Sequence, residues 1–150
     1  MDLITLLEQH QDTIVAEAAE ALARAHLPRY EASGAAENTA RLRRLFDLTR
    51  QCLANRDLIP MLDYARRIAE ERFESGYDLR EVQTGFNVLE EVIWKYITAG
   101  MAPQDYPQAF GLTSTVLGAG KEALAVEYVT LASHHLTPTL NMSALFRNPA

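Results

Sequence analysis

Apolar residues recur along this chain at helical spacing almost throughout, and no stretch alternates convincingly as a half-buried strand would. In the middle of the chain, for example, Met61, Ala65 and Ile68 share one side of a helical turn pattern whose opposite side is charged. The pattern predicts an all-α bundle of about five main helices with short connections. We expect these helices near residues 2–25, 37–55, 58–75, 79–99 and 108–133.

The stretch ERFESGYDLREV, residues 71–82, predicts a tight corner between the third and fourth of these helices. Gly76 can take the left-handed conformation that ends a helix. Asp78 and Glu81 are three positions apart, the spacing of a capping box that begins the next helix. This structural reading is sufficient, and the alternative is a point where a signal moves one helix against another. An earlier stretch, LPRYEASGAA after the first helix, is predicted to be a loop.

The fifth predicted helix is apolar on more than one face, so it needs two partners. One partner is the core of its own chain, and we expect the other to be a second copy, which makes the protein a homodimer. The alternative is a central helix covered on both faces by its own chain. The predicted interface comprises Leu112, Val116, Ala119, Ala123 and Val126. Beyond this helical domain, residues 1–133, the segment 134–150 has the composition of a linker or a loosely docked tail.

Composition narrows the classes of function. The chain has 150 residues and a formal net charge of −6, which argues against a general nucleic-acid binder because phosphate neutralisation needs a basic surface. A local cluster of Arg41, Arg43 and Arg44 is flanked by acidic residues, so we interpret it as a solvated helix face in preference to an anion site. The single Cys52 excludes an intrachain disulfide. With neither a signal peptide nor a membrane span, the sequence predicts a soluble, cytoplasmic protein without a membrane partner.

Residues that carry catalysis do not converge in any recognisable motif. The histidines have no metal-ligand spacing, and adjacent carboxylates point in different directions on a helix. We therefore expect no enzyme activity, no metal and no cofactor. A ligand pocket between helices is the remaining alternative, which would make the protein a carrier or sensor of a small apolar ligand. Its candidate lining residues are Tyr77, Phe86, Trp94 and Tyr96, although core and interface roles explain the same aromatic residues.

Residues 65–97 resemble the signature of a known family. The matching features are a charged helix, a glycine, a cap and an apolar run, carried by Glu71, Arg72, Gly76, Leu79, Glu81, Val82, Leu89 and Ile93. The early stretch LLEQHQDTIVAEAAEALAR is similar to the same family's first helix. Over roughly residues 3–133 the chain resembles the N-terminal helical sensor domain of the RsbT co-antagonist family, the RsbR-type proteins of stressosomes.

This resemblance implies a globin-like helical fold without haem, a homodimer and a role in receiving a signal. The signal would pass to a C-terminal output domain, often a STAS domain, or to a regulatory partner protein. Residues 134–150 are too few for such a domain. We therefore expect the chain to be either part of a longer protein or a freestanding sensor domain that acts through a partner.

Overall fold

The computed structural model describes residues 1–139, and along them it has six α-helices and one short 3₁₀ turn but no strand. The all-α fold predicted from the sequence is therefore confirmed. The elements are α1 (Leu3–Arg24), α2 (Pro28–Ser33), α3 (Ala35–Asn55), α4 (Ile59–Glu74), α5 (Leu79–Gly100), η1 (Pro103–Asp105) and α6 (Tyr106–Thr139).

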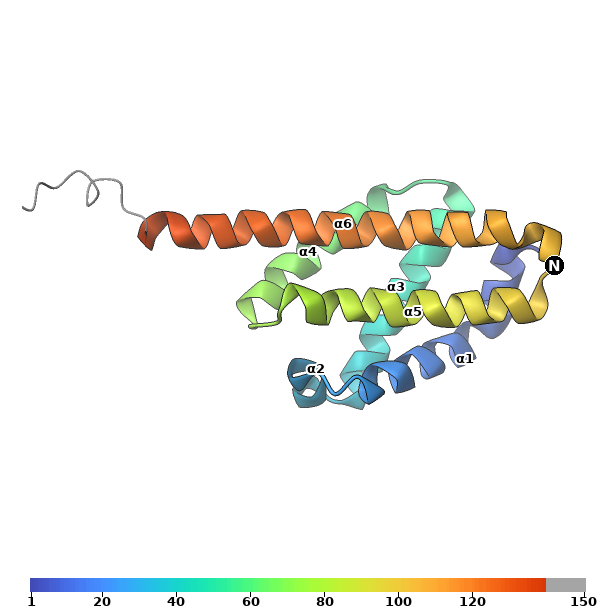
Figure 1. Cartoon of the computed structure of the whole chain (residues 1–150), viewed down its shortest axis with the longest axis horizontal. Coiled ribbons are helices and arrows are strands. Elements are labelled where there is room, and N and C mark those ends of the chain that lie inside the picture. Colours follow the sequence, from blue (N-terminus) through green and yellow to red (C-terminus); the bar gives the residue numbers. More distant parts are fainter. Residues whose placement is uncertain (140–150) are drawn as a thin grey trace, which may run out of the picture.

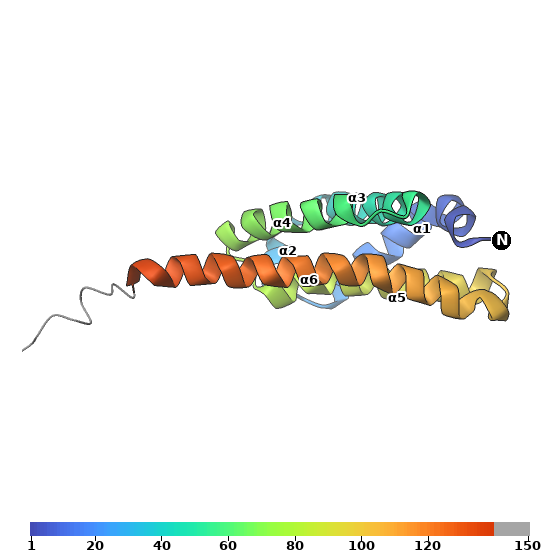
Figure 2. The ribbon, with the colours of Figure 1, turned by 90° about the horizontal axis from the view of Figure 1, so that it is seen from above.

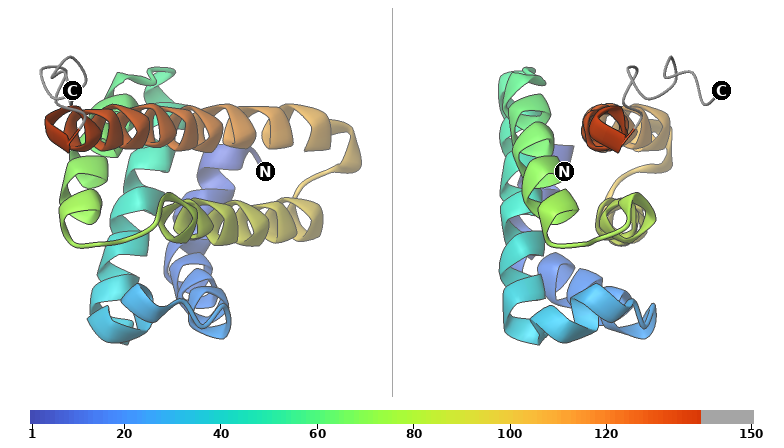
Figure 3. Two further views of the ribbon diagram at one scale, coloured as in Figure 1. Left: turned by 60° about the vertical axis from the view of Figure 1, so that its left-hand side comes forward. Right: turned by 90° about the vertical axis from the view of Figure 1, so that its left-hand side faces the viewer.

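The helices pack as crossed layers (Figures 1 and 2). α5 and α6 lie side by side in one layer, and α3 and α4 lie across from them, as Figure 3 shows from the side and along α6. α4 packs chiefly on α6, while α1 packs on both α5 and α3. This arrangement is compatible with the globin-like fold that the family resemblance implies.

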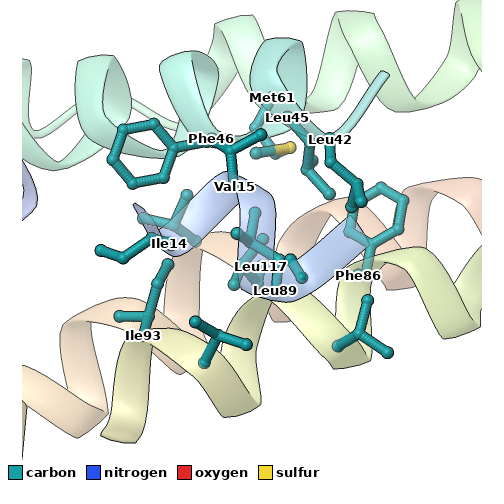
Figure 4. Close-up of a cluster of buried hydrophobic side chains, with 14 of the residues drawn as sticks. Ile14, Val15, Leu42, Leu45, Phe46, Met61, Phe86, Leu89, Ile93 and Leu117 are labelled. Carbon is teal, nitrogen blue, oxygen red and sulfur yellow. The ribbon is translucent and has the colours of Figure 1, made fainter. Parts of the chain in front are cut away.

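The core fills the space between the layers. Figure 4 shows side chains from five helices meeting there, among them Ile14, Phe46, Phe86 and Leu117, each of which is at most 2% exposed. Burying a side chain of this size contributes about 1.5–3 kcal/mol. Gly120 of α6 permits close packing with both neighbouring helices, because a Cβ there would lie 2.7 Å from the Phe86 ring of α5 and 2.9 Å from the Met61 sulfur of α4.

The structure differs from the sequence prediction at one loop and at one helix end. The stretch LPRYEASGAA is not a loop, since Pro28 begins the short helix α2 and the buried Tyr30 fixes that helix against the core. Six residues are too few to show a helical period, and proline is well tolerated in a first turn. The last helix runs past the predicted end at residue 133 to Thr139, so the first part of the predicted linker is helical. The rest of that linker, residues 140–150, lies outside the described residues.

The predicted corner between α4 and α5 is confirmed. Gly76 has a φ of +82°, the left-handed conformation that a side chain disfavours. Asp78 and Glu81 form the capping box of α5, in which the Asp78 backbone N–H donates to Glu81 Oε1 at 3.3 Å. The chain thus reverses direction within a few residues and enters the second layer.

Candidate functional site

Tyr77, the residue after the corner glycine, lies where several helices meet. Its ring packs edge-on against Tyr30 of α2, with the ring centroids 5.3 Å apart. Its hydroxyl accepts a hydrogen bond from Arg41 Nη1 of α3 at 2.7 Å and donates to the Arg29 carbonyl oxygen at 3.3 Å. Its own carbonyl oxygen accepts from the Tyr128 hydroxyl of α6 at 3.0 Å. The corner is therefore a junction between α2, α3 and α6 as well as a reversal of the chain.

Arg72 of α4 completes this junction, and its burial is unexpected for an arginine. The residue is 5% exposed, and its guanidinium carbon lies 5.7 Å from the centroid of the Tyr77 ring. Its Nη1 donates to Oε1 of the exposed Glu71 at 2.9 Å, whereas its buried Nε has no hydrogen-bond partner among the described residues. An unpaired buried donor is destabilising. We refer to Tyr30, Arg41, Arg72, Tyr77 and Tyr128 as the corner cluster.

Sequence reasoning placed Arg72 in the charged helix of the family signature and did not predict its burial, although the chain carries a signal for it. Position 72 follows Ile68 by four residues and Ala69 by three, so helical spacing places it on the buried side of α4. The neighbouring charges of the ERFE stretch directed attention to the exposed side instead. An arginine on the buried side of a helix is rare unless it is paired, so such a position indicates a buried interaction or a binding site.

Glu81 ties the corner to α2. The side chain is 9% exposed, so nearly all of its surface is covered by protein. While Oε1 accepts from the Asp78 backbone, Oε2 accepts from the Arg29 backbone N–H at 3.2 Å. The predicted capping residue of α5 therefore also fixes the start of α2, to which Arg29 belongs. The cap has a tertiary role that spacing alone does not reveal.

Burial shifts the pKa values of the tyrosines around the junction. It raises the pKa of Tyr30 and of Tyr128 to about 12, against the opposing attraction of the Arg72 charge. Burial also raises the pKa of Tyr64, whose ring lies 5.7 Å from the Arg44 guanidinium carbon. The Tyr128 hydroxyl therefore keeps the proton that it donates to the corner to a higher pH than a solvated tyrosine would.

The four aromatic residues proposed to line a ligand pocket do not surround one cavity. Phe86 and Tyr77 are buried, and the cavity that touches Phe86 measures about 30 Å³, room for about one or two water molecules. Trp94 is 41% exposed and packs on Phe110. Tyr96 lies on nearly the opposite side of α5, where its hydroxyl donates to Glu17 Oε1 at 3.2 Å.

The structure separates the predicted interface residues of α6. Val116 is 4% exposed, so it belongs to the core of its own chain and is not available to a partner. Ala119 and Ala123 are half-buried. Leu112 and Val126 are exposed, at 37% and 60%. Helical spacing identified a broad apolar surface on this helix but placed the boundary between core and solvent too far out.

The solvent face of α6 carries almost no charge, and three of its exposed residues are large and apolar. Between positions 111 and 133 its exposed residues carry a single charge, that of Glu122, and they include Val129, which is 64% exposed and was not predicted. Solvated helix faces are usually charged, and exposed apolar surfaces of this kind mark interaction sites. The exposed positions are Gly111, Leu112, Thr115, Glu122, Val126, Val129, Thr130 and Ser133, which we call the α6 strip.

The C-terminal turns of α6 project beyond the rest of the bundle. In both Figure 1 and Figure 2 the helix continues past the corner between α4 and α5. Val126 and Val129 occupy the half of α6 that leads into this projection. The strip is thus accessible on the part of the helix that leaves the domain.

The described part of the chain shows neither a candidate metal site nor a candidate membrane-spanning helix. Residues 1–139 contain no group of three or more His, Cys, Asp or Glu side chains placed to hold a metal ion. No helix among them combines the length and apolarity needed to cross a bilayer. Cys52 is buried, and burial raises the pKa of its thiol.

The fold is an all-α bundle with a polar junction at its central corner and a last helix that projects from it, which places the chain in the class of helical-bundle domains. Within that class, residues 7–132 match the family described as the RsbT co-antagonist protein rsbRD N-terminal domain. The chain belongs to this family, as the sequence resemblance predicted. A comparison with curated proteins finds no significant match. The family's description is that of part of a co-antagonist, which is a regulatory protein.

Proposed function

We propose that this chain is a non-catalytic sensor domain in stress signalling that dimerises through α6 and passes a signal to a C-terminal output domain or partner protein. Family membership supports the regulatory role. The observation that carries the dimer is the α6 strip, which exposes Leu112, Val126 and Val129 on a helix that leaves the bundle. Burial of apolar side chains drives such association.

A second copy of the chain is a suitable partner for this strip. In a two-fold dimer the same surface meets itself, so each exposed valine would contact an apolar residue of the other copy. Glu122 restricts the geometry, because two copies of one carboxylate near the axis would repel. The axis therefore crosses α6 away from Glu122, closer to Val126 and Val129 on the projecting half.

The corner cluster provides a route to α6. Tyr128 bonds to the corner, while Val126, two residues earlier, faces nearly the opposite way on the same helix. A change in the position of the corner would therefore act on the inner side of α6 and shift its outer side against the second copy. Coupling of this kind passes through packed elements and hydrogen bonds.

Val126→Glu tests the dimer. The side chain is 60% exposed, so the substitution should leave the fold intact and place repelling carboxylates in the interface. We expect light scattering to show a wild-type dimer and at least about a tenfold weaker dimer for the variant. Ala16→Glu, which adds the same charge on the exposed side of α1, is the matched control. A monomeric wild type, or a variant dimer of unchanged affinity, would refute the proposal.

A cellular experiment tests the regulatory role separately. Val126→Glu and Ala16→Glu are introduced into the gene, and a stress-responsive reporter is compared at equal protein levels. We expect the first variant to change the response to stress and the second to preserve it. An unchanged response in a host whose Val126→Glu protein is monomeric would contradict signalling through α6.

A further inference from the structure

The neighbouring helices α3 and α4 place four arginines around one surface pocket of about 380 Å³. Arg41 and Arg44 are three positions apart on α3, so they point to the same side of that helix. Arg67 and Arg72 of α4, five positions apart, also line the pocket. The pocket opens next to the corner cluster, with which it shares Arg41 and Arg72.

The pocket is basic on a protein that is acidic overall. Its four arginines are accompanied by two acidic side chains, Glu37 and Glu71, which leaves a formal surplus of two positive charges. The whole chain carries −6. Concentrating arginines in this way costs repulsion between like charges, which an anion in the pocket would relieve.

Two of the arginines are engaged by the protein and two are not. Arg41 Nη2 pairs with Glu37 at 2.7 Å, and Arg72 pairs with Glu71. Arg44 lies over the ring of Tyr64. Neither Arg44 nor the exposed Arg67 forms an ion pair among the described residues. These two guanidinium groups are accessible and have unused donors.

Arg43 and Arg66 show that this arrangement is not general to the arginines of the two helices. Arg43, next to Arg44, points elsewhere and pairs with Asp12 of α1 at 3.0 Å. Arg66, next to Arg67, pairs with Asp63 of its own helix at 3.7 Å. The sequence interpretation of the Arg41–Arg44 cluster as a solvated face did not anticipate the second pair of arginines from α4.

The buried Arg72 supplies an independent reason to expect a ligand. It lines both this pocket and the small cavity beneath it, and its Nε has no partner among the described residues. Its one carboxylate partner, Glu71, is 67% exposed, so the buried charge is only partly compensated. Arginine is the residue that proteins favour both for buried ion pairs and for phosphate recognition.

We propose that this pocket binds a small molecule that carries a phosphate group. Arginine donors match the oxygens of a phosphate in a forked geometry, and Arg44 and Arg67 are placed to bind it from two sides. The space is larger than a bare phosphate needs and falls in the usual range for small-molecule sites. Tyr64, Ala40 and Ile68 offer apolar surface to the remainder of the ligand.

The charge of the whole molecule argues for a small ligand. A long polyanion such as a nucleic acid would also interact with the rest of a chain whose net charge is −6, whereas a small anion responds chiefly to the local arginines. The proposal does not depend on the α6 strip, because none of the pocket residues belongs to α6. A monomeric protein could still bind the ligand, and a protein that binds no ligand could still form the dimer.

Inorganic phosphate is the probe for the test. It is titrated against the full chain by nuclear magnetic resonance, with chloride at matched ionic strength and succinate as a dicarboxylate in parallel titrations. The test variant is Arg44→Gln/Arg67→Gln, and the control is Arg43→Gln/Arg66→Gln, which removes the same charge from adjacent positions of the same helices. Circular dichroism verifies that both variants are folded.

We expect saturable phosphate binding by the wild type and the control, with at least about a tenfold loss of affinity in the test variant. Resonances of α3 and α4 near the pocket should move most. Absence of saturation in the wild type, an equal response to chloride, or equal binding by both variants would overturn the site. Tighter binding of succinate than of phosphate would overturn the phosphate assignment.

Discussion

Arg72 is a charged residue at a position that helical spacing assigns to the core, and stability alone gives little reason for it. A buried ion pair contributes little net free energy, and replacing it by an apolar side chain of similar volume is often neutral or stabilising. Glu71, the partner, is exposed and would not be left unpaired in the interior. The residue therefore points to binding or coupling rather than to folding.

Arg72→Met should consequently leave the free energy of unfolding within about 1 kcal/mol of the wild-type value. Arg72→Ala should lower it by about 2–3 kcal/mol, because the shorter side chain leaves a cavity beside Tyr77. Chemical denaturation followed by circular dichroism measures both. Equal losses for the two variants would show that the charge itself stabilises the fold.

The tyrosines of the corner cluster predict a loss of stability at high pH. The folded state raises the pKa of Tyr30 and Tyr128 from 10.0 to about 12, so it holds these protons more tightly than the unfolded chain does. This tighter proton binding contributes to the free energy of unfolding in full below pH 10, and the contribution is lost as the pH rises towards 12. We expect each tyrosine to account for about 2 kcal/mol of that loss.

Tyr30→Phe and Tyr128→Phe test this expectation by denaturation at several pH values. Each variant should lose less stability between pH 10 and 12 than the wild type, since phenylalanine has no proton to release. Tyr106→Phe, at a half-exposed tyrosine, is the control and should follow the wild type. Parallel curves for all four proteins would contradict the argument.

At the scale of the elements, two helices end at a residue with left-handed backbone conformation, and only one of these residues adopts it without strain. Gly76 adopts a positive φ without strain, and a Cβ there would lie 2.8 Å from Nη2 of Arg29. Arg56 ends α3 at a φ of +51°, a conformation that its side chain disfavours. Glycine is thus present at one helix end and absent at the other.

Gly76→Ala should therefore lower the free energy of unfolding by about 1–2 kcal/mol, whereas Arg56→Gly should raise it by up to about 1 kcal/mol. Thermal or chemical denaturation gives both values. Changes in stability of opposite sign at the two positions would distinguish an effect of backbone conformation from a general sensitivity to substitution. If the two changes shift stability in the same direction, backbone conformation is not what decides these helix ends.

Much of the element plan could be predicted from the sequence, because long amphipathic helices and their caps are local signals. α2 escaped because six residues carry no period, and the contacts that fix it, through Tyr30 and the Arg29 backbone, are distant in sequence. The corner was located by Gly76 and its capping box. Its junction with α3 and α6 could not be predicted, since Tyr77 meets its partners only through the crossing of the layers.

At the scale of the whole molecule, the corner cluster and the α6 strip occupy opposite sides of one helix. The first is buried and polar, and it connects α6 to the rest of the bundle through Tyr128. The second is exposed and apolar, and it lies partly on the projecting half of α6. Such a helix can report the state of the domain to whatever contacts its outer side.

If α6 mediates a homodimer, the stability of the domain must depend on protein concentration. Association stabilises the folded state by mass action, because the unfolded chain presents no strip to a partner. The melting temperature of the wild type should therefore rise by several degrees over about a hundredfold increase in concentration. Val126→Glu should melt at a temperature independent of concentration, and Ala16→Glu should follow the wild type. A wild-type melting temperature that stays constant over this range, while the protein remains folded and unaggregated, would show that the α6 strip is not covered by a second copy of the chain.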